Sequence, residues 1–293
     1  MAKKSDGKNS GAETVLAGVE GALARIAGAL ERLTPAPAPA DLSGGAVFVW
    51  EACDKRARPA ARFDALPLSL LRGLDEHAAR LLDNTSAFAK GLPANNALLW
   101  GARGAGKSAL IKAVFAEIAK EAPLKLIELH RAEVADAPAL IAALRDARDR
   151  CIVFCDDLSF EAADEAYKAL KTLLEGGVEG RPDNVIFYAT SNRKHLTPRM
   201  MAENEDAMAI RRGEAGHETT SLADRFGLSL GFYEATQADY LDIVESYARA
   251  FGFDGDPDEV RREALQWAAR RGARSGRVAW QFAQAMRARK GGG

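Results

Sequence analysis

A segment in the first half of the chain has the composition and spacing of a loop that binds phosphate groups. Residues 101–108 read Gly-Ala-Arg-Gly-Ala-Gly-Lys-Ser and fit the pattern G-x-x-x-x-G-K-[ST] without a mismatch. Glycines let backbone N–H groups curl around phosphate oxygens, and the helix that follows directs its positive dipole end at them. In this pattern Lys107 contacts the β- and γ-phosphates, and the Ser108 hydroxyl binds Mg²⁺. The segment therefore predicts a nucleoside triphosphate site.

The residues around this segment favour a nucleotide site over a purely structural turn. Residues 97–100 form a short apolar run typical of a buried strand, and residues 109–119 carry apolar side chains at helical spacing. A strand, a glycine loop and a helix in that order are the context that the pattern requires. We expect the nucleotide to contact Gly101, Ala102, Arg103, Gly104, Ala105, Gly106, Lys107, Ser108 and Ala109.

Two acidic residues follow an apolar run further along the chain. Residues 151–155 are apolar, as expected of a strand covered on both faces, and Asp156 and Asp157 come directly after them. In a phosphate-loop ATPase, the first acid at this place holds Mg²⁺ and the second polarises the attacking water. We predict these roles for Asp156 and Asp157. A helix N-cap role is the alternative for either residue.

These motifs together resemble those of the AAA+ ATPases. Residues 101–108 resemble their Walker A motif, and Phe-Cys-Asp-Asp at 154–157 resembles Walker B. Ala-Thr-Ser-Asn at 189–192 resembles the end of the sensor 1 strand, which assigns Asn192 to the γ-phosphate or the water. Ser-Leu-Ala-Asp-Arg-Phe-Gly at 221–227 resembles the segment that carries an arginine finger, with Arg225 in that position.

The resemblance extends to the C-terminal part and covers about residues 70–290. The helical tail is similar to the AAA+ lid, in which Arg277, with Arg274 as the alternative, corresponds to sensor 2. Three runs resemble more narrowly an uncharacterised bacterial AAA+ family catalogued as domain of unknown function 815. They are Gly-Leu-Pro-Ala-Asn-Asn at 91–96, Phe-Cys-Asp-Asp-Leu-Ser-Phe-Glu at 154–161 and Glu-Gly-Arg-Pro-Asp-Asn at 179–184. The resemblance implies ATP and Mg²⁺ as cofactors and an ATP site shared between subunits of a homo-oligomer.

Two of these roles have a structural alternative. For Asn192 it is an Asx turn that ends the strand. For Arg225 it is a surface ion pair with Asp224 or Glu234. Arg277 lies near a predicted helix start, where the helix dipole favours anions, so an arginine there is easier to explain if a phosphate faces it.

The second acid departs from the family pattern. AAA+ proteins usually have Asp-Glu in Walker B, whereas this chain has Asp156-Asp157. Because aspartate is one methylene shorter, we expect slow hydrolysis, as in a switch rather than a motor. Glu161 is an alternative base, and His130, at the end of a predicted strand, either restrains the acid or caps a helix.

Composition excludes few partner classes. The 293-residue chain has 40 basic and 41 acidic residues, so its overall charge does not favour nucleic acid or a membrane. Its three cysteines do not form a disulfide framework, and Cys151 and Cys155 are expected to pack in the core, with metal ligation as the alternative. Since the first residues lack the apolar stretch of a signal peptide and no membrane-spanning run follows, we expect a cytoplasmic protein.

The order of the patterns predicts the domain organisation. Strands alternate with helices between residues 41 and 233, which predicts a parallel α/β sheet with helices on both faces, and residues 234–293 are all helical. For residues 1–40 we expect a disordered start, an amphipathic helix with an apolar seam at residues 16–33, and a linker of alternating Ala and Pro. The helix either lies on the body of the same protein or assists assembly as a docking helix or short coiled coil. The predicted strands are 46–50, 97–100, 124–129, 151–155, 184–190 and 227–232, and the helices before the tail are 75–89, 109–119, 137–148 and 161–175.

The client of such an ATPase does not follow from the motifs. Remodelling or loading of a protein, a DNA-associated role similar to initiators and helicase loaders, and a nucleotide-gated switch with slow hydrolysis all remain open. The polar loop at residues 194–220 is either disordered or a contact surface. Arginines gather in residues 261–290, where they either bind nucleic acid or form solvated helix faces.

Overall fold

The computed structural model describes residues 39–158, 165–175, 181–192, 225–253 and 255–290. The apolar seam at residues 16–33, Glu161 and the loop at residues 194–220 lie outside the described residues. None of the described helices is both long enough and apolar enough to cross a membrane.

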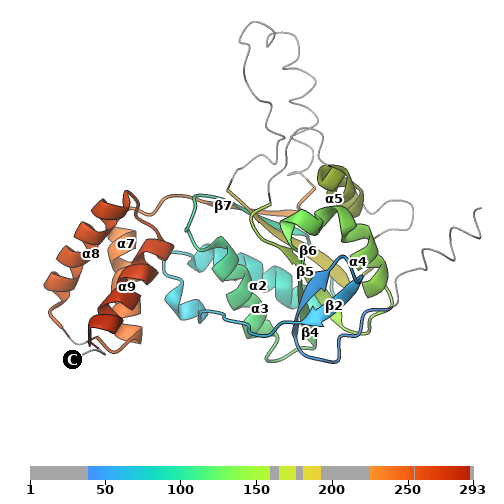
Figure 1. Cartoon of the computed structure of the whole chain (residues 1–293), viewed down its shortest axis with the longest axis horizontal. Coiled ribbons are helices and arrows are strands. Elements are labelled where there is room, and N and C mark those ends of the chain that lie inside the picture. The colour runs from blue at the N-terminus through green and yellow to red at the C-terminus, as the bar shows by residue number, and fades with distance from the viewer. Residues whose placement is uncertain (1–38, 159–164, 176–180, 193–224, 254, 291–293) are drawn as a thin grey trace, which may run out of the picture. The chain divides into compact units, whose positions relative to one another are not determined.

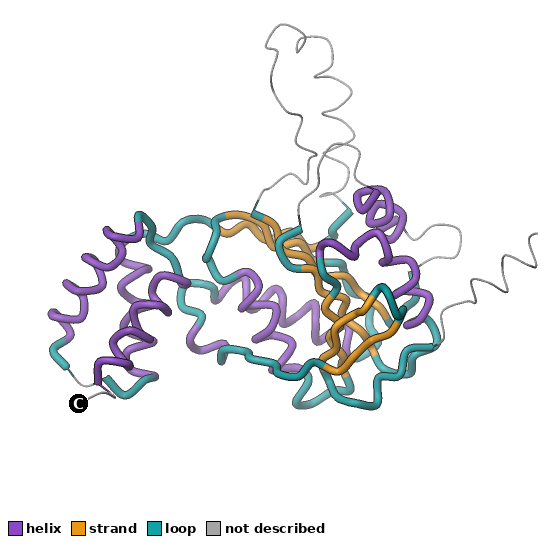
Figure 2. The backbone as a smooth tube through the Cα atoms, in the orientation of Figure 1, coloured by secondary structure: helices purple, strands orange, loops and turns teal. Residues whose placement is uncertain are grey.

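A seven-stranded sheet forms the centre of the fold (Figures 1 and 2). Its strands lie in the order β2-β1-β4-β5-β6-β3-β7, and each pairing is parallel except that of β1 with β2. The predicted strands are all present. The bounds are β1 Val47–Glu51, β2 Arg56–Pro59, β3 Ala97–Gly101, β4 Leu124–Glu128, β5 Arg150–Cys155, β6 Val185–Ser191 and β7 Leu228–Phe232.

Helices cover both faces of this sheet, which explains the apolar runs in the sequence. Helices α2 (Asp75–Ala89) and α3 (Lys107–Ile118) pack on one face, and α4 (Ala137–Leu144) and α5 (Glu165–Glu175) pack on the other with the 3-10 helix η2 (Arg131–Asp136) (Figure 1). On β5, Cys151, Val153 and Cys155 join one core cluster while Ile152 and Phe154 join the other. Alternate residues point to opposite faces, so a strand covered on both sides is apolar throughout.

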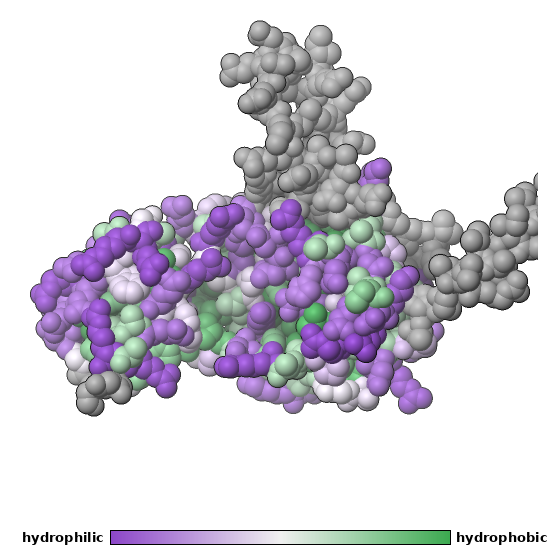
Figure 3. Space-filling view, in the orientation of Figure 1, coloured by the Kyte–Doolittle hydropathy of each residue, from purple (hydrophilic) through white to green (hydrophobic). Residues whose placement is uncertain are grey.

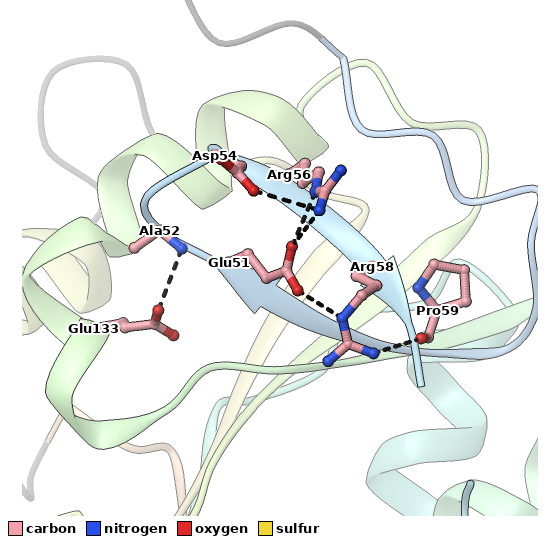
Figure 4. Close-up of polar contacts among 7 residues, drawn as sticks. All are labelled: Glu51, Ala52, Asp54, Arg56, Arg58, Pro59 and Glu133. Atoms are coloured by element: carbon pink, nitrogen blue, oxygen red, sulfur yellow. Dashed lines mark hydrogen bonds and ion pairs between the residues drawn. The ribbon is translucent and has the colours of Figure 1, made fainter. Parts of the chain in front are cut away.

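The hairpin of β1 and β2 extends the sheet at the β4 edge, and its second strand was not predicted. Glu51 on β1 accepts hydrogen bonds from Nε of Arg56 at 2.9 Å and of Arg58 at 2.6 Å (Figure 4). Both bonds lower the pKa of Glu51, and the bond from Arg58 has the larger effect. The backbone N–H of Ala52 donates to Oε1 of Glu133 at 3.2 Å, which ties the hairpin to η2. A strand of charged residues that ends in proline has no periodic apolar signal, because it lies at a sheet edge.

The helix before β5 ends earlier than predicted, and an asparagine accounts for its end. Helix α4 ends at Leu144, whereas the sequence pattern extended to residue 148. The Nδ2 atom of Asn184 donates to the carbonyl oxygens of Leu144 at 2.9 Å and Ala147 at 3.0 Å. These bonds satisfy carbonyl groups that a longer helix would have used internally.

Three helices follow the sheet and have a hydrophobic core of their own. They are α7 (Gln237–Ala250), α8 (Pro257–Arg271) and α9 (Gly276–Lys290). Their predicted starts are confirmed: Thr236 and Asp239 form a capping box, Asp256 caps α8, and the Oγ atom of Ser275 accepts from the N–H of Val278. Figure 3 shows apolar residues between these helices and the part that holds the sheet, on a face that is otherwise mostly hydrophilic. The division of the chain at residues 40 and 233 stays a prediction.

Candidate functional site

The glycine loop of the sequence connects the end of β3 with the first turn of α3. Gly106 is the N-cap of α3 and has φ 96°, in the left-handed region that glycine adopts readily. Gly101 has φ 125°, and a Cβ atom there would overlap the carbonyl oxygen of Phe232 on β7. The path of the loop therefore depends on glycine, and it places the N-terminus of α3, with its unpaired N–H groups, at the loop.

Lys107 is buried at the start of α3 with 7% of its surface exposed. Its Nζ atom donates to the carbonyl oxygens of Gly101 at 2.9 Å and Ala102 at 2.8 Å, and to Oδ1 of Asn192 at 3.2 Å. Burial lowers the pKa of this amine, and the charges of Asp157 and Asp156 act in the opposite direction. All three of these acceptors are neutral oxygens. A phosphate oxygen carries a negative charge and would therefore form a stronger hydrogen bond with the ammonium group.

Ser108 and Asp156 lie next to each other although they are far apart in the sequence. The Oγ atom of Ser108 donates to Oδ1 of Asp156 at 2.5 Å. A hydroxyl and a carboxylate are the hard oxygen ligands that Mg²⁺ prefers, and the cation usually takes only one or two protein ligands beside phosphates and water. The residues present at this point fit a magnesium ion.

Asp157 has a backbone conformation that is rare for residues other than glycine. Its φ is 52°, in the left-handed region, which aspartate tolerates better than most residues. The Oδ1 atom of its carboxylate accepts a 2.5 Å hydrogen bond from Nδ2 of Asn192. The amide of Asn192 therefore joins Lys107 to Asp157, because its two ends bind one residue each.

These residues surround a cavity of about 1030 Å³. One part is polar and includes residues 103–108 of the glycine loop, which we call the phosphate loop below. It also includes both aspartates, Asn192 and Arg277. The other part is apolar and comes from the segment before α2 and from the C-terminal helices, and none of the sequence motifs described above includes its residues. The apolar residues are Leu66, Leu70, Leu71, Leu74, Ile243, Tyr247 and Trp280. Their signal in the sequence is ordinary core periodicity, so only the tertiary structure distinguishes them.

Arg277 reaches this cavity, and Arg274 does not. Arg277 lines the large cavity, and its backbone N–H donates to the carbonyl oxygen of Gly104 at 3.2 Å. Arg274 lines a smaller neighbouring cavity of about 380 Å³. The first turn of α9 thus contacts the phosphate loop directly, and two helix N-termini, those of α3 and α9, meet at the loop.

Arg225 lies at the opposite end of the sheet. It precedes β7, and β7 pairs with β3 in parallel so that Phe232 lies beside Gly101. The phosphate loop follows the carboxyl ends of these strands, and a strand of five residues spans about 16 Å. Arg225 therefore does not reach the cavity of its own chain. Of the two alternative ion-pair partners, Glu234 lies at the other end of β7 from Arg225, and Asp224 lies outside the described residues.

Three further residues have a clear position. His130 is exposed at the N-cap of η2, makes no side-chain cap bond and does not line the cavity. Cys151 and Cys155 are buried in the core cluster on the α4 and α5 face. In the described part of the chain, no group of three potential metal ligands from His, Cys, Asp and Glu occurs. This favours core packing for the two cysteines.

Comparison with known proteins gives a family and a fold. Residues 44–290 match the model of a family described as protein of unknown function (DUF815). A structure of the Orc1 protein of Aeropyrum pernix in complex with DNA is 20% identical over 74% of this chain, with a TM-score of 0.51. The match spans 58% of the length of that Orc1 chain. The RuvB Holliday junction branch migration motor of Thermotoga maritima is 13% identical over 74% of this chain and 73% of its own, with a TM-score of 0.43. No protein with a curated description matches.

Proposed function

The chain belongs to the DUF815 family and has the P-loop fold of the AAA+ ATPases, and from this we propose that it is a Mg²⁺-dependent ATPase. Its site is shared between subunits of a homo-oligomer, and it acts on a macromolecular client. The observation that carries the proposal is the cavity in which Lys107, Ser108, Asp156, Asp157, Asn192 and Arg277 meet.

The charges of the cavity suit a triphosphate. Lys107 contributes a buried amine, and among the described residues the guanidinium groups of Arg103 and Arg277 have no hydrogen bond or ion pair. Cations without carboxylate partners at two helix N-termini favour a ligand with several negative charges. The apolar part of the same cavity suits a nucleobase. We assign the loop residues 101–109 to the phosphates and Arg277 to the γ-phosphate.

The polar side chains can orient the reacting groups. Ser108 and Asp156 would hold Mg²⁺, which neutralises phosphate charge when it is bound. Asp157 would orient the attacking water and accept its proton, and Asn192 would bind a γ-phosphate oxygen or the water. The short side chain of Asp157 and its bond to Asn192 support slow hydrolysis. A switch that binds ATP and turns over rarely is the second candidate on this ground.

The position of Arg225 supports a site that needs a second subunit. The arginine lies at the other end of the sheet from its own phosphate loop, so any nucleotide that it contacts would have to be bound by a neighbouring subunit. An arginine supplied in trans stabilises the charge of the transferred phosphoryl group and accelerates hydrolysis by orders of magnitude.

The arginines of the C-terminal helices favour a protein client over nucleic acid. Several of them pair with carboxylates of the same helices: Arg261 with Glu245 and Asp258, Arg262 with Glu259, and Arg289 with Glu263. Internal pairing reduces the positive charge that a phosphate backbone would meet. The Orc1 structure contains DNA, so duplex DNA is still included in the test.

The test uses two variants of the full chain that each lack a different half of the site. Lys107→Ala should lose ATP binding, while Arg225→Ala should bind ATP and lose turnover. Mixing the two proteins should restore part of the turnover, because Arg225 of one subunit meets the intact cavity of the other. Lys120→Ala, which changes an exposed lysine two residues after the end of α3, is the matched control.

Mass measurement in ATP and turnover with and without DNA complete the experiment. We expect a larger particle in ATP and turnover that does not depend on DNA. Absence of ATP binding by the wild-type protein would refute the ATPase, and full turnover by monomeric Arg225→Ala would refute the shared site. A stimulation by DNA that falls steeply with salt would instead identify nucleic acid as the client.

A further inference from the structure

Thr190 is a buried hydroxyl at the end of β6 that the motifs do not assign to a role. Only 1% of its surface is exposed, and it lies between the Walker B segment and Asn192. Its Oγ1 atom donates to Oδ1 of Asp156 at 2.5 Å and accepts from the backbone N–H of Asp157 at 2.8 Å. Its carbonyl oxygen accepts from the N–H of Leu158 at 2.7 Å. One residue thus binds three consecutive residues after β5.

We infer that Thr190 is the positioning residue of the site: its hydroxyl fixes the backbone of Asp157 and orients the carboxylate of Asp156. This inference rests on the proposed ATPase function. Thr190 lines the cavity, but both contacts of its hydroxyl are to the two aspartates, so its removal should reduce turnover and leave ATP affinity almost unchanged.

The hydrogen-bond inventory of the hydroxyl supports this role. A threonine hydroxyl has one proton and two lone pairs. The proton goes to Asp156, and a lone pair receives the N–H of Asp157, so both aspartates are held by the same oxygen. No other arrangement of a single hydroxyl proton satisfies both contacts, because the N–H of Asp157 can only donate and a carboxylate can only accept.

The carboxylate of Asp156 is oriented by the same set of bonds. Its Oδ1 atom accepts from Oγ of Ser108, from Oγ1 of Thr190 and, at 3.1 Å, from the N–H of Asp157. Its Oδ2 atom takes no hydrogen bond from the described residues. Three donors on one oxygen therefore leave the other as the atom that Asp156 can offer to a cation.

The conformation of Asp157 explains why such a clamp is needed. A left-handed backbone is unfavourable for a residue with a side chain, by about 1–2 kcal/mol, and it persists where neighbouring contacts hold it. The N–H of Asp157 points at Thr190 and Asp156, and its side chain points at Asn192. Without the hydroxyl, the backbone loses its shorter bond and the carboxylate its fixed direction.

The decisive comparison is between three variants of the full chain. Thr190→Val keeps the shape and removes the hydroxyl, whereas Thr190→Ser keeps the hydroxyl. Thr85→Val is the matched control, since Thr85 is also buried and its hydroxyl bonds Leu81 and Tyr188 away from the cavity. We expect kcat of Thr190→Val to fall about 10- to 100-fold, as for a catalytic group displaced by about 1 Å. The dissociation constant for ATP should change by less than about threefold.

The serine variant should recover most of the turnover, and Thr85→Val should lose thermal stability but keep its kcat. A second readout needs no nucleotide: amide hydrogen exchange at Asp157, measured by NMR, should accelerate at least about tenfold in Thr190→Val and not in Thr85→Val. Wild-type kcat together with unchanged exchange at Asp157 in Thr190→Val would overturn the inference. If the wild-type protein did not bind ATP, the proposed function would fail, while the exchange experiment would still decide whether Thr190 holds Asp157.

Discussion

The Nζ atom of Lys107 donates to the Oδ1 atom of Asn192 across 3.2 Å, although the two residues follow different strands. The bond exists because β3 and β6 are parallel neighbours in the sheet, so that their carboxyl ends lie side by side where the phosphate loop begins. The other end of the same amide binds Asp157. Asn192 thus connects the residue proposed to bind phosphate with the residue proposed to orient water.

We expect Asn192→Ala to separate binding from hydrolysis. Lys107 keeps its two carbonyl acceptors in this variant, so the ammonium group stays in place and ATP affinity should change little. Turnover should fall about 100-fold, the effect of removing one donor from a reacting oxygen. Titration with a fluorescent ATP analogue and a phosphate-release assay measure the two quantities. An equal loss of affinity and turnover would assign Asn192 to ground-state binding instead.

Substitutions of Asp157 test whether its length or its charge limits the reaction. Asn tolerates the left-handed region, so Asp157→Asn should fold normally, bind ATP and lose turnover. Asp157→Glu restores the usual length but is less suited to φ 52°. We expect its Tm to fall by about 2–4 °C, which corresponds to ~1 kcal/mol in a protein of this size, and its kcat to rise. Retained turnover in Asp157→Asn would exclude this residue as the base.

Gly104 tests the contact between the phosphate loop and α9. It has φ 74°, and a Cβ atom there would lie 2.8 Å from Oγ of Ser275 and 3.1 Å from Cβ of Arg277. Gly252 has φ 67° and nothing within 4 Å of such an atom, so Gly252→Ala is the control for backbone strain alone. Both alanine variants should lose about 1 kcal/mol of stability. Only Gly104→Ala should also weaken ATP binding, by about tenfold, because it separates α9 from the loop.

The two arginines at the start of α9 provide a matched pair. Arg277 and Lys107 line the same cavity. Burial lowers the pKa of Lys107, and the charge of Arg277 acts in the same direction. Arg277→Ala should therefore weaken ATP binding about tenfold, the loss of one charge-assisted hydrogen bond. Arg274→Ala should bind as the wild type does, since Arg274 lines the smaller cavity. Isothermal titration calorimetry measures the ATP affinity of both variants. A larger loss of affinity in Arg274→Ala would assign the phosphate contact to Arg274 instead of Arg277.

The cysteines should differ in reactivity. Burial raises the pKa of Cys151 and of Cys155 to about 12. At pH 8 only about one in ten thousand of these thiols is ionised, and the thiolate is the reactive form. Cys53 is exposed. Mass spectrometry after brief alkylation of the native protein should find one modified cysteine, and all three after unfolding. Rapid modification of Cys151 or Cys155 would mean that the core around β5 opens readily.

The sequence by itself determined the elements whose signals are local. The glycine loop, the apolar strands on either side of Asp156 and the caps at Thr236, Asp256 and Ser275 follow from residue types at short spacing. Each depends on backbone hydrogen bonds or side-chain periodicity within a few residues, and the sequence contains that information directly. The sequence also places Asp156 and Asn192 at the same end of the sheet, because each follows a predicted parallel strand and the carboxyl ends of parallel strands lie together.

Tertiary structure decided what depends on contacts between distant segments. The role inferred for Thr190 arises because β6 lies beside β5, and in the sequence it is an ordinary strand residue. The end of α4 depends on Asn184, forty residues after Leu144, and β2 depends on the ion pairs of Glu51. Arg225 and Arg277 are both arginines near the start of an element. The pairing of β7 with β3 places Arg225 at the far end of the sheet, and the contact of α9 with Gly104 places Arg277 in the cavity. Burial and pairing are properties of the assembled chain, so local patterns do not contain them.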